Sequence, residues 1–274
     1  MNAKSIIKLA FLLTLIGSAF RFFLFDTPLR SLLWNEAVMQ PILSHFGIQW
    51  ESIANSLLFD RILVWTGKVI ATYLSICALI LIVKKELSRN LVLIITFLFL
   101  FFSILNWMDN FFHLPYLLEQ SIFCFTGWIY LMEKEQQTSF KFIKLLIALT
   151  FIGHGLYAMN IYNIPGEFVQ LTMNSTGFVE KDSIVLLKII GIFDILFSLF
   201  LFSKNKKIVV IGLIYCIIWG ITTAISRLIG HYHLELGIHS LDEYWHECII
   251  RIPNGLVPLY LLVKLRFKSF RISH

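Results

Sequence analysis

Long apolar segments fill most of the chain and alternate with short polar ones. A helix needs about 20 predominantly apolar residues to cross the hydrocarbon core of a bilayer, and it pairs its backbone groups internally. The pattern therefore predicts an all-α, polytopic membrane bundle of about eight transmembrane helices. The expected spans are residues 6–25, 62–83, 91–108, 115–132, 142–160, 184–202, 208–229 and 247–264. The fourth and eighth spans begin with polar or charged residues, and a count of seven would put the C-terminus outside.

Basic residues predict the orientation, because Lys and Arg gather in cytoplasmic loops. With a cytoplasmic N-terminus, the inner segments hold 15 of the 23 Lys and Arg residues. The outer loops then hold only Arg30, Arg61 and Lys181. Both termini are therefore expected in the cytoplasm. No small-x-small cleavage site follows the first apolar run, so that run is expected to be an uncleaved signal-anchor helix.

Composition agrees with lipid as the main surroundings, since 58% of the residues are hydrophobic and 15% are charged. The net charge of +6 follows from the basic inner loops and does not indicate nucleic-acid binding. The four cysteines form no C-x-x-C pair, which argues against a dithiol oxidoreductase or a thiolate metal site. The chain also lacks a nucleotide-binding glycine loop and a nucleophile elbow, so soluble-enzyme chemistry is not expected.

A weak internal duplication divides the chain into residues 1–135 and 136–274, each with four expected helices. A shift of 122 residues superposes Asp60 on Asp182 and the pair Lys84-Lys85 on Lys206-Lys207. Each half also has a long first outer loop with an early proline, Pro28 or Pro165. An even number of spans per half predicts a parallel repeat. Chance similarity between two apolar four-helix units is the alternative.

Ionisable residues within or beside the spans are candidates for function, because burying one in lipid costs roughly 2.5–3.5 kcal/mol on insertion scales. Most of them lie towards the outer ends of the expected helices. Two opposite-charge pairs are expected there, Arg21 with Glu119 and Arg227 with Glu247. Asp194 needs a partner from another helix, and Lys68 is a candidate. The candidates for a polar ligand pocket are Arg21, Glu119, His154, Arg227, His231, His233, Glu247 and Arg251. Structural ion pairs and charged side chains that reach the interface are the alternative.

The segment from Arg227 to Arg251 has the highest density of histidines and carboxylates. Its candidates for metal ligation are His231, His233, His239 and His246. Their spacing does not decide between a metal site and a solvated outer loop, and the chain has no H-E-x-x-H motif. The sequence names no cofactor.

The run from Gly191 to Phe202 looks like the glycine-plus-acid second helix of DoxX-like four-helix membrane proteins. The segments His154–Ala158 and Arg251–Pro258 are similar in kind to that group. The resemblance implies a bacterial inner-membrane protein of a group in which some members are linked to quinone or thiol redox systems and many have no known role. This chain departs from the group in having two four-helix units and no redox cysteines. No catalytic residue is carried over.

Three functions are compatible with these observations. The first is an accessory or ligand-binding inner-membrane protein with a polar, His-rich pocket on the periplasmic side, and its partner is a membrane protein or a quinone-like small molecule. The second is a membrane-embedded redox or metal-dependent enzyme component, for which His154, His231, His233 and Glu247 should meet. The third is a proton-coupled transporter of small solutes, for which a polar path lined by Asp194 or Lys188 should reach the inner face.

Overall fold

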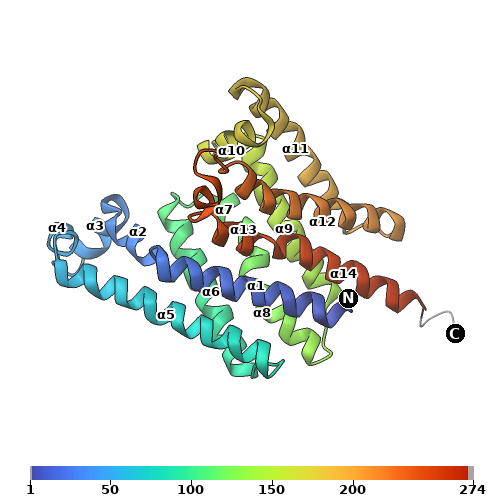
Figure 1. Ribbon diagram of the computed structural model, residues 1–274, viewed down its shortest axis with the longest axis horizontal. Helices are drawn as coiled ribbons and strands as arrows, with labels where there is room; N and C mark the ends of the chain where they lie inside the picture. The colour runs from blue at the N-terminus through green and yellow to red at the C-terminus, as the bar shows by residue number, and fades with distance from the viewer. Residues whose placement is uncertain (1, 271–274) are drawn as a thin grey trace.

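The computed structural model describes residues 2–270, and all regular secondary structure within that range is helical (Figure 1). The helices are α1 (Ala3–Leu24), α2 (Pro28–Trp34), α3 (Glu36–Ser44), α4 (Trp50–Ala54), α5 (Leu57–Val83), α6 (Arg89–Asp109), α7 (Leu114–Glu119), α8 (Ser121–Lys134), α9 (Phe140–Ala158), α10 (Gly166–Thr176), α11 (Glu180–Phe200), α12 (Lys206–Ile229), the 3-10 helix η1 (Gly237–Leu241), α13 (Trp245–Arg251) and α14 (Pro253–Phe270). The expected all-α membrane class is confirmed by this architecture.

Seven helices in the described residues are long and apolar enough to cross a membrane. They are α1, α5, α6, α9, α11, α12 and the segment Trp245–Arg266, in which α14 follows α13 after the single residue Ile252. The expected fourth span is instead divided at Gln120 into α7 and α8. Neither of these two helices reaches the length of a span alone, so the count of eight stays a prediction.

Polar residues begin several of the long helices, where the first backbone N–H groups have no partner within the helix. The side chains of Asn2, Ser56, Ser88, Ser139 and Asn205 each accept a hydrogen bond from such an N–H group. In α11, Glu180 and Asp182 place negative charge in the first turn, where it is favourable to the helix dipole. Short polar signals between apolar runs therefore set the starts of these helices.

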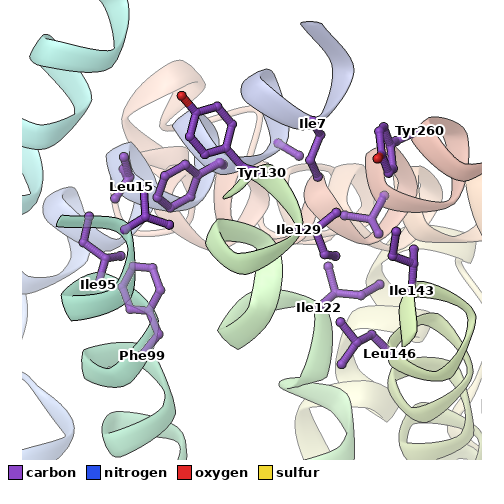
Figure 2. Close-up of a cluster of buried hydrophobic side chains, with 14 of the residues drawn as sticks. Ile7, Leu15, Ile95, Phe99, Ile122, Ile129, Tyr130, Ile143, Leu146 and Tyr260 are labelled. Carbon is purple, nitrogen blue, oxygen red and sulfur yellow. The ribbon is translucent and has the colours of Figure 1, made fainter. Parts of the chain in front are cut away.

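The apolar core lies where α1, α6, α8, α9 and α14 meet (Figure 2). Phe11 of α1 stacks on Tyr130 of α8 with ring centroids 5.4 Å apart. Ile143 of α9 and Tyr260 of α14 close the other side of this core. Large apolar side chains also cover the outside of the long helices, as Val69 of α5, which is 65% exposed, illustrates. Such apolar outer faces fit a bilayer environment.

Two glycines allow close helix contacts that resemble each other. Gly17 of α1 faces Ile250 of α13, and Gly153 of α9 faces the backbone of Pro115 and Glu119 in α7. The two glycines end matching segments, Lys8–Gly17 and Lys144–Gly153, which share the pattern Lys-Leu-x-x-x-Leu-Thr-x-Ile-Gly. Helix α1 therefore packs against the short helix α13, and helix α9 packs against the short helix α7.

Ion pairs join the helices at the end of the bundle where α1 begins. Glu86, in the turn after α5, pairs with Lys4 at 3.2 Å and with Lys134 at 3.3 Å. Glu133 of α8 pairs with Lys264 of α14 at 2.7 Å and accepts a hydrogen bond from Tyr260 at 2.7 Å. These contacts connect the two halves of the chain at this end.

Candidate functional site

A cavity of about 550 Å³ opens at the end of the bundle where α1, α6, α9 and α12 finish. Its walls come from both halves of the chain and include the two interrupted segments, α7–α8 and α13–α14. Six of the eight candidate pocket residues line it, namely Arg21, Glu119, His154, Arg227, Glu247 and Arg251. Aromatic side chains such as Phe102 and Trp219 supply much of the remaining wall. The cavity therefore combines charged groups with apolar surface.

The other two candidates, His231 and His233, are not among the lining residues. The ring of His231 stacks on Tyr244 with centroids 3.5 Å apart, and partial burial lowers the pKa of its imidazole. His233 is exposed, and its backbone N–H donates to Ser240 Oγ at 3.2 Å. The cavity is consequently less rich in histidine than the sequence predicts.

The structure does not gather the four candidate metal ligands into one site. Within residues 2–266, no group of three or more His, Cys, Asp or Glu side chains is arranged to hold a metal ion. His239 lies beside Asp242 on the surface, with Nδ1 and Oδ2 3.3 Å apart. His246 instead lines the cavity, where its ring packs against Phe20 and Phe25. The spacing of the four histidines along the chain did not predict that they lie in separate places.

Arg227 is the most deeply buried cation of the cavity, with a side chain that is 3% exposed. It forms the expected pair with Glu247, since Nη1 lies 3.1 Å from Oε2. It also pairs with Glu167 of α10, a residue that the sequence did not single out. A buried guanidinium needs such partners, because an uncompensated charge inside a membrane protein is costly. These contacts attach α10 and α13 to the end of α12.

Arg21 and Glu119 do not form the predicted ion pair. Glu119 ends α7, which packs against α9, whereas α1 with Arg21 packs against α13. Among the ion pairs of residues 2–266, none includes Arg21, Glu119 or Arg251. Oε1 of Glu119 is buried and has no hydrogen-bond partner. Three ionisable groups of the cavity thus form no ion pair within the described chain.

Asp194 is fully buried in α11 and holds the ring of His154. His154 Nδ1 and Asp194 Oδ2 are 2.6 Å apart, and the Tyr215 hydroxyl donates to Asp194 Oδ1 at 2.7 Å. The suggested partnership of Asp194 with Lys68 is wrong, because the Lys68 ammonium lies instead over the ring of Trp65. Since Nδ1 faces the carboxylate, Nε2 is the ring nitrogen left for the cavity that His154 lines.

Close helix packing explains why Asp194 reaches His154. A Cβ atom on Gly155 would lie 2.8 Å from the carbonyl oxygen of Gly191 and 3.2 Å from Cβ of Asp194. Glycine at both positions lets α9 and α11 approach closely enough for their side chains to bond. Tyr215 and Glu167 carry no motif that marks them as partners. The repeated Lys-Leu-x-x-x-Leu-Thr-x-Ile-Gly pattern is the one signal that could have indicated which helices meet at the cavity.

No family model matches the chain, and neither a curated protein nor a solved structure matches it. The resemblance to DoxX-like proteins therefore stays a prediction.

Proposed function

We propose that the chain is a bacterial inner-membrane protein that binds a small polar molecule in this cavity from the periplasmic side. The observation that carries the proposal is the convergence of charged groups from both halves on one cavity. Three of them, Arg21, Glu119 and Arg251, have no ion-pair partner among the described residues. Ionisable groups within a membrane bundle are costly, and they commonly mark binding sites or ion pathways. A volume of about 550 Å³ lies within the range of small-molecule sites.

The proposal includes eight crossings, two four-helix halves at residues 1–135 and 136–274, and both termini in the cytoplasm. The matching segments Lys8–Gly17 and Lys144–Gly153 support the duplication, as does the equivalent packing of their glycines. In this arrangement α7 and α8 together form one interrupted crossing. Interrupted helices are typical of binding sites in membrane transporters, because a break frees backbone groups beside the ligand.

The lining positions of the third helix in each half support the same arrangement. Phe102, Asn106 and Asn110 line the cavity from α6 and its end, and Trp219, Thr223 and Arg227 line it from α12. Trp219, Thr223 and Arg227 lie 117 positions after Phe102, Asn106 and Asn110, respectively. The two sets match in position but differ in chemistry. A cavity between related halves can thus present a different surface to each end of a ligand.

Ligand binding accounts for the cavity better than metal-dependent catalysis does. The enzyme hypothesis required His154, His231, His233 and Glu247 to meet, whereas His231 and His233 lie outside the lining. Proton-coupled transport is the second candidate, because Asp194 is joined to the cavity through His154. Buried acids beside a histidine are common in proton pathways of transporters. That candidate also requires the site to open towards the inner face.

Reaction of engineered cysteines with a charged, membrane-impermeant methanethiosulfonate tests the proposed cavity. The four native cysteines are buried, so the background reaction should be low. Thr223→Cys places a thiol in the cavity, and Ile218→Cys on the same helix places one on an outward face that is 62% exposed. In intact cells we expect Thr223→Cys to react at least tenfold faster, because the control thiol faces lipid. Equal rates, or reaction of Thr223→Cys only in inverted vesicles, would contradict the proposal.

A further inference from the structure

The charges that line the cavity fall into a paired set and an unpaired set. Arg227 pairs with Glu167 and Glu247, and Asp26 pairs with Arg30, with Nε and Oδ2 2.8 Å apart. The lining cations and carboxylates without an ion pair in the described chain are Arg21, Arg251, Glu119 and Glu243. The unpaired set thus contains two guanidinium groups and two carboxyl groups. Their balance distinguishes this cavity from a site for a simple anion or a simple cation.

Glu119 and Arg251 occupy similar places in the two interrupted segments. Glu119 is the last residue of α7, and Arg251 is the last residue of α13. The charges of His154, Arg251 and Arg227 lie close enough to act on Glu119, yet none of these residues forms an ion pair with it within 4 Å. Oε1 of Glu119 is buried without a partner, and no hydrogen bond within the described chain occupies the Arg251 guanidinium. Opposite charges thus face the cavity without neutralising each other.

We propose that the ligand is a small zwitterion that bridges these two residues. Its ammonium group binds Glu119, and its carboxylate or phosphate group binds Arg251, whose planar fork of donors suits either anion. Tyr116 and Phe123 line the cavity close to Glu119 along the chain and offer aromatic surface to an apolar part of the ligand. This assignment rests on the proposed function and names the ligand class.

Ligands with one charge fit the cavity less well for a physical reason. A simple anion that binds Arg251 leaves the partly buried Glu119 carboxyl without an ion pair. A simple cation that binds Glu119 leaves the Arg251 guanidinium without an ion pair. A buried charge is tolerated when it is paired and hydrogen-bonded, so both residues gain a partner only from a ligand with both charges. Free amino-acid-like solutes and phosphoethanolamine headgroups of lipids share this chemistry.

Calorimetric titration of the purified full chain in detergent tests the ligand class. The zwitterionic probes are glycine and phosphoethanolamine, the anions are acetate and inorganic phosphate, and the cation is ethylammonium. We expect at least one zwitterion to bind tenfold or more tighter than every probe that carries charge of one sign only. Equal affinities, or no binding by either zwitterion, would overturn the proposal. The thiol reaction of Thr223→Cys would remain fast in that case, so failure of this inference is distinguishable from failure of the proposed function.

Two variants assign the charges to their residues. Glu119→Gln should weaken binding of the zwitterion at least tenfold and leave acetate binding unchanged, whereas Arg251→Gln should weaken both. Glu36→Gln and Arg61→Gln change the same residue types at exposed positions outside the cavity, and they should bind all probes as the natural chain does. The ranking of probes on the natural chain requires no variant, so the inference can still be contradicted if a variant does not fold. An unchanged zwitterion affinity in both cavity variants would also contradict it.

Binding measurements in nanodiscs distinguish the two sources of the zwitterion, a lipid headgroup and a free solute. If the site takes a lipid headgroup, phosphatidylethanolamine should compete with soluble phosphoethanolamine, and phosphatidylglycerol should not. If the site takes a free solute, both lipids should leave the affinity for the soluble probe unchanged. Competition by phosphatidylglycerol as strong as that by phosphatidylethanolamine would show that a single negative charge suffices, and it would overturn the zwitterion assignment.

Discussion

The buried carboxylate of Asp194 is the residue on which the orientation of His154 depends. It accepts hydrogen bonds from two helices, through His154 and Tyr215. We expect Asp194→Asn to lower the free energy of unfolding by about 1.5–3 kcal/mol, because hydrogen bonds to charged groups contribute that much. Tyr215→Phe should cost about 1.5 kcal/mol, the lower end of this range, because it removes one bond and leaves the His154 contact intact. Thermal unfolding in detergent measures both.

The exposed Glu36→Gln variant is the control for these two substitutions and should change stability by less than about 0.5 kcal/mol. If Asp194→Asn unfolded at the same temperature as the natural chain, the carboxylate would not hold His154 as described. A larger loss for Tyr215→Phe than for Asp194→Asn would also contradict this account of the contact.

Glu86 provides a pH-dependent contact at the other end of the bundle. Hydrogen bonds from Lys4 and Lys134 hold the pKa of its carboxyl below the ordinary value of 4.5. Because the folded-state pKa is the lower one, its stabilising effect is fully present above the unfolded-state pKa. The effect is lost as pH falls through the folded-state pKa. We expect the difference in melting temperature between the natural chain and Glu86→Gln to be constant near neutral pH and to shrink below about pH 4. A difference that grows on acidification would contradict this.

At the scale of elements, the glycine contacts of α1 and α9 determine how closely the broken helices approach. A Cβ atom on Gly153 would lie 2.6 Å from the Pro115 carbonyl oxygen and 2.8 Å from the Glu119 nitrogen. Because these are backbone atoms, Gly153→Ala should displace α7 and cost about 1–3 kcal/mol. Gly17→Ala should cost a similar amount, because its nearest contact is Cγ1 of Ile250, whose branched Cβ atom restricts rotation in a helix, and the Ile250 backbone nitrogen lies 3.1 Å away.

Gly166→Ala is the matched control, since nothing lies within 4 Å of the added Cβ atom at the start of α10. It should leave the unfolding temperature unchanged or raise it slightly, because alanine restricts the unfolded chain more than glycine does. If Gly153→Ala were as stable as this control, the close packing of α9 on α7 would be wrong. Loss of ligand affinity in Gly153→Ala would follow from displacement of Glu119 at the end of α7.

The limits of sequence reasoning are clearest at the breaks between elements. Pro253 signals the interruption between α13 and α14, because proline lacks the N–H group that continues a helix. Gln120 carries no such signal, and just after the division the Ile122 N–H donates to the Thr150 hydroxyl of α9, a contact that hydropathy does not report. In contrast, the polar residues at the outer ends of the expected helices correctly predicted that Arg227 and Glu247 lie close together. The partner of Asp194 was missed, because it depends on the relative rotation of α9, α11 and α12.

At the scale of the whole molecule, the number of crossings decides which face holds the cavity. The segment from the start of α7 to the end of α8 contains 21 residues, Leu114–Lys134. At 1.5 Å per residue it is about 31 Å long, which matches a hydrocarbon core of about 30 Å. Its basic end, at Lys134, joins Glu86 and Lys4 at the end of the bundle where α1 begins. The geometry therefore favours a crossing by α7 and α8 despite the break at Gln120.

Single cysteines on the two sides of this segment provide the measurement. Phe112→Cys lies before α7, Gln137→Cys follows α8, Asn205→Cys lies between α11 and α12, and Leu234→Cys follows α12. With eight crossings and a cytoplasmic N-terminus, an impermeant maleimide applied to intact cells should label the first and last of these and spare the middle two. If α7 and α8 did not cross, the reagent would label Gln137→Cys and Asn205→Cys and would spare Leu234→Cys. That result would place Lys204, Lys206 and Lys207 outside, although basic residues prefer the cytoplasm. It would also place the ends of α9 and α12 that line the cavity on the inner face of the membrane.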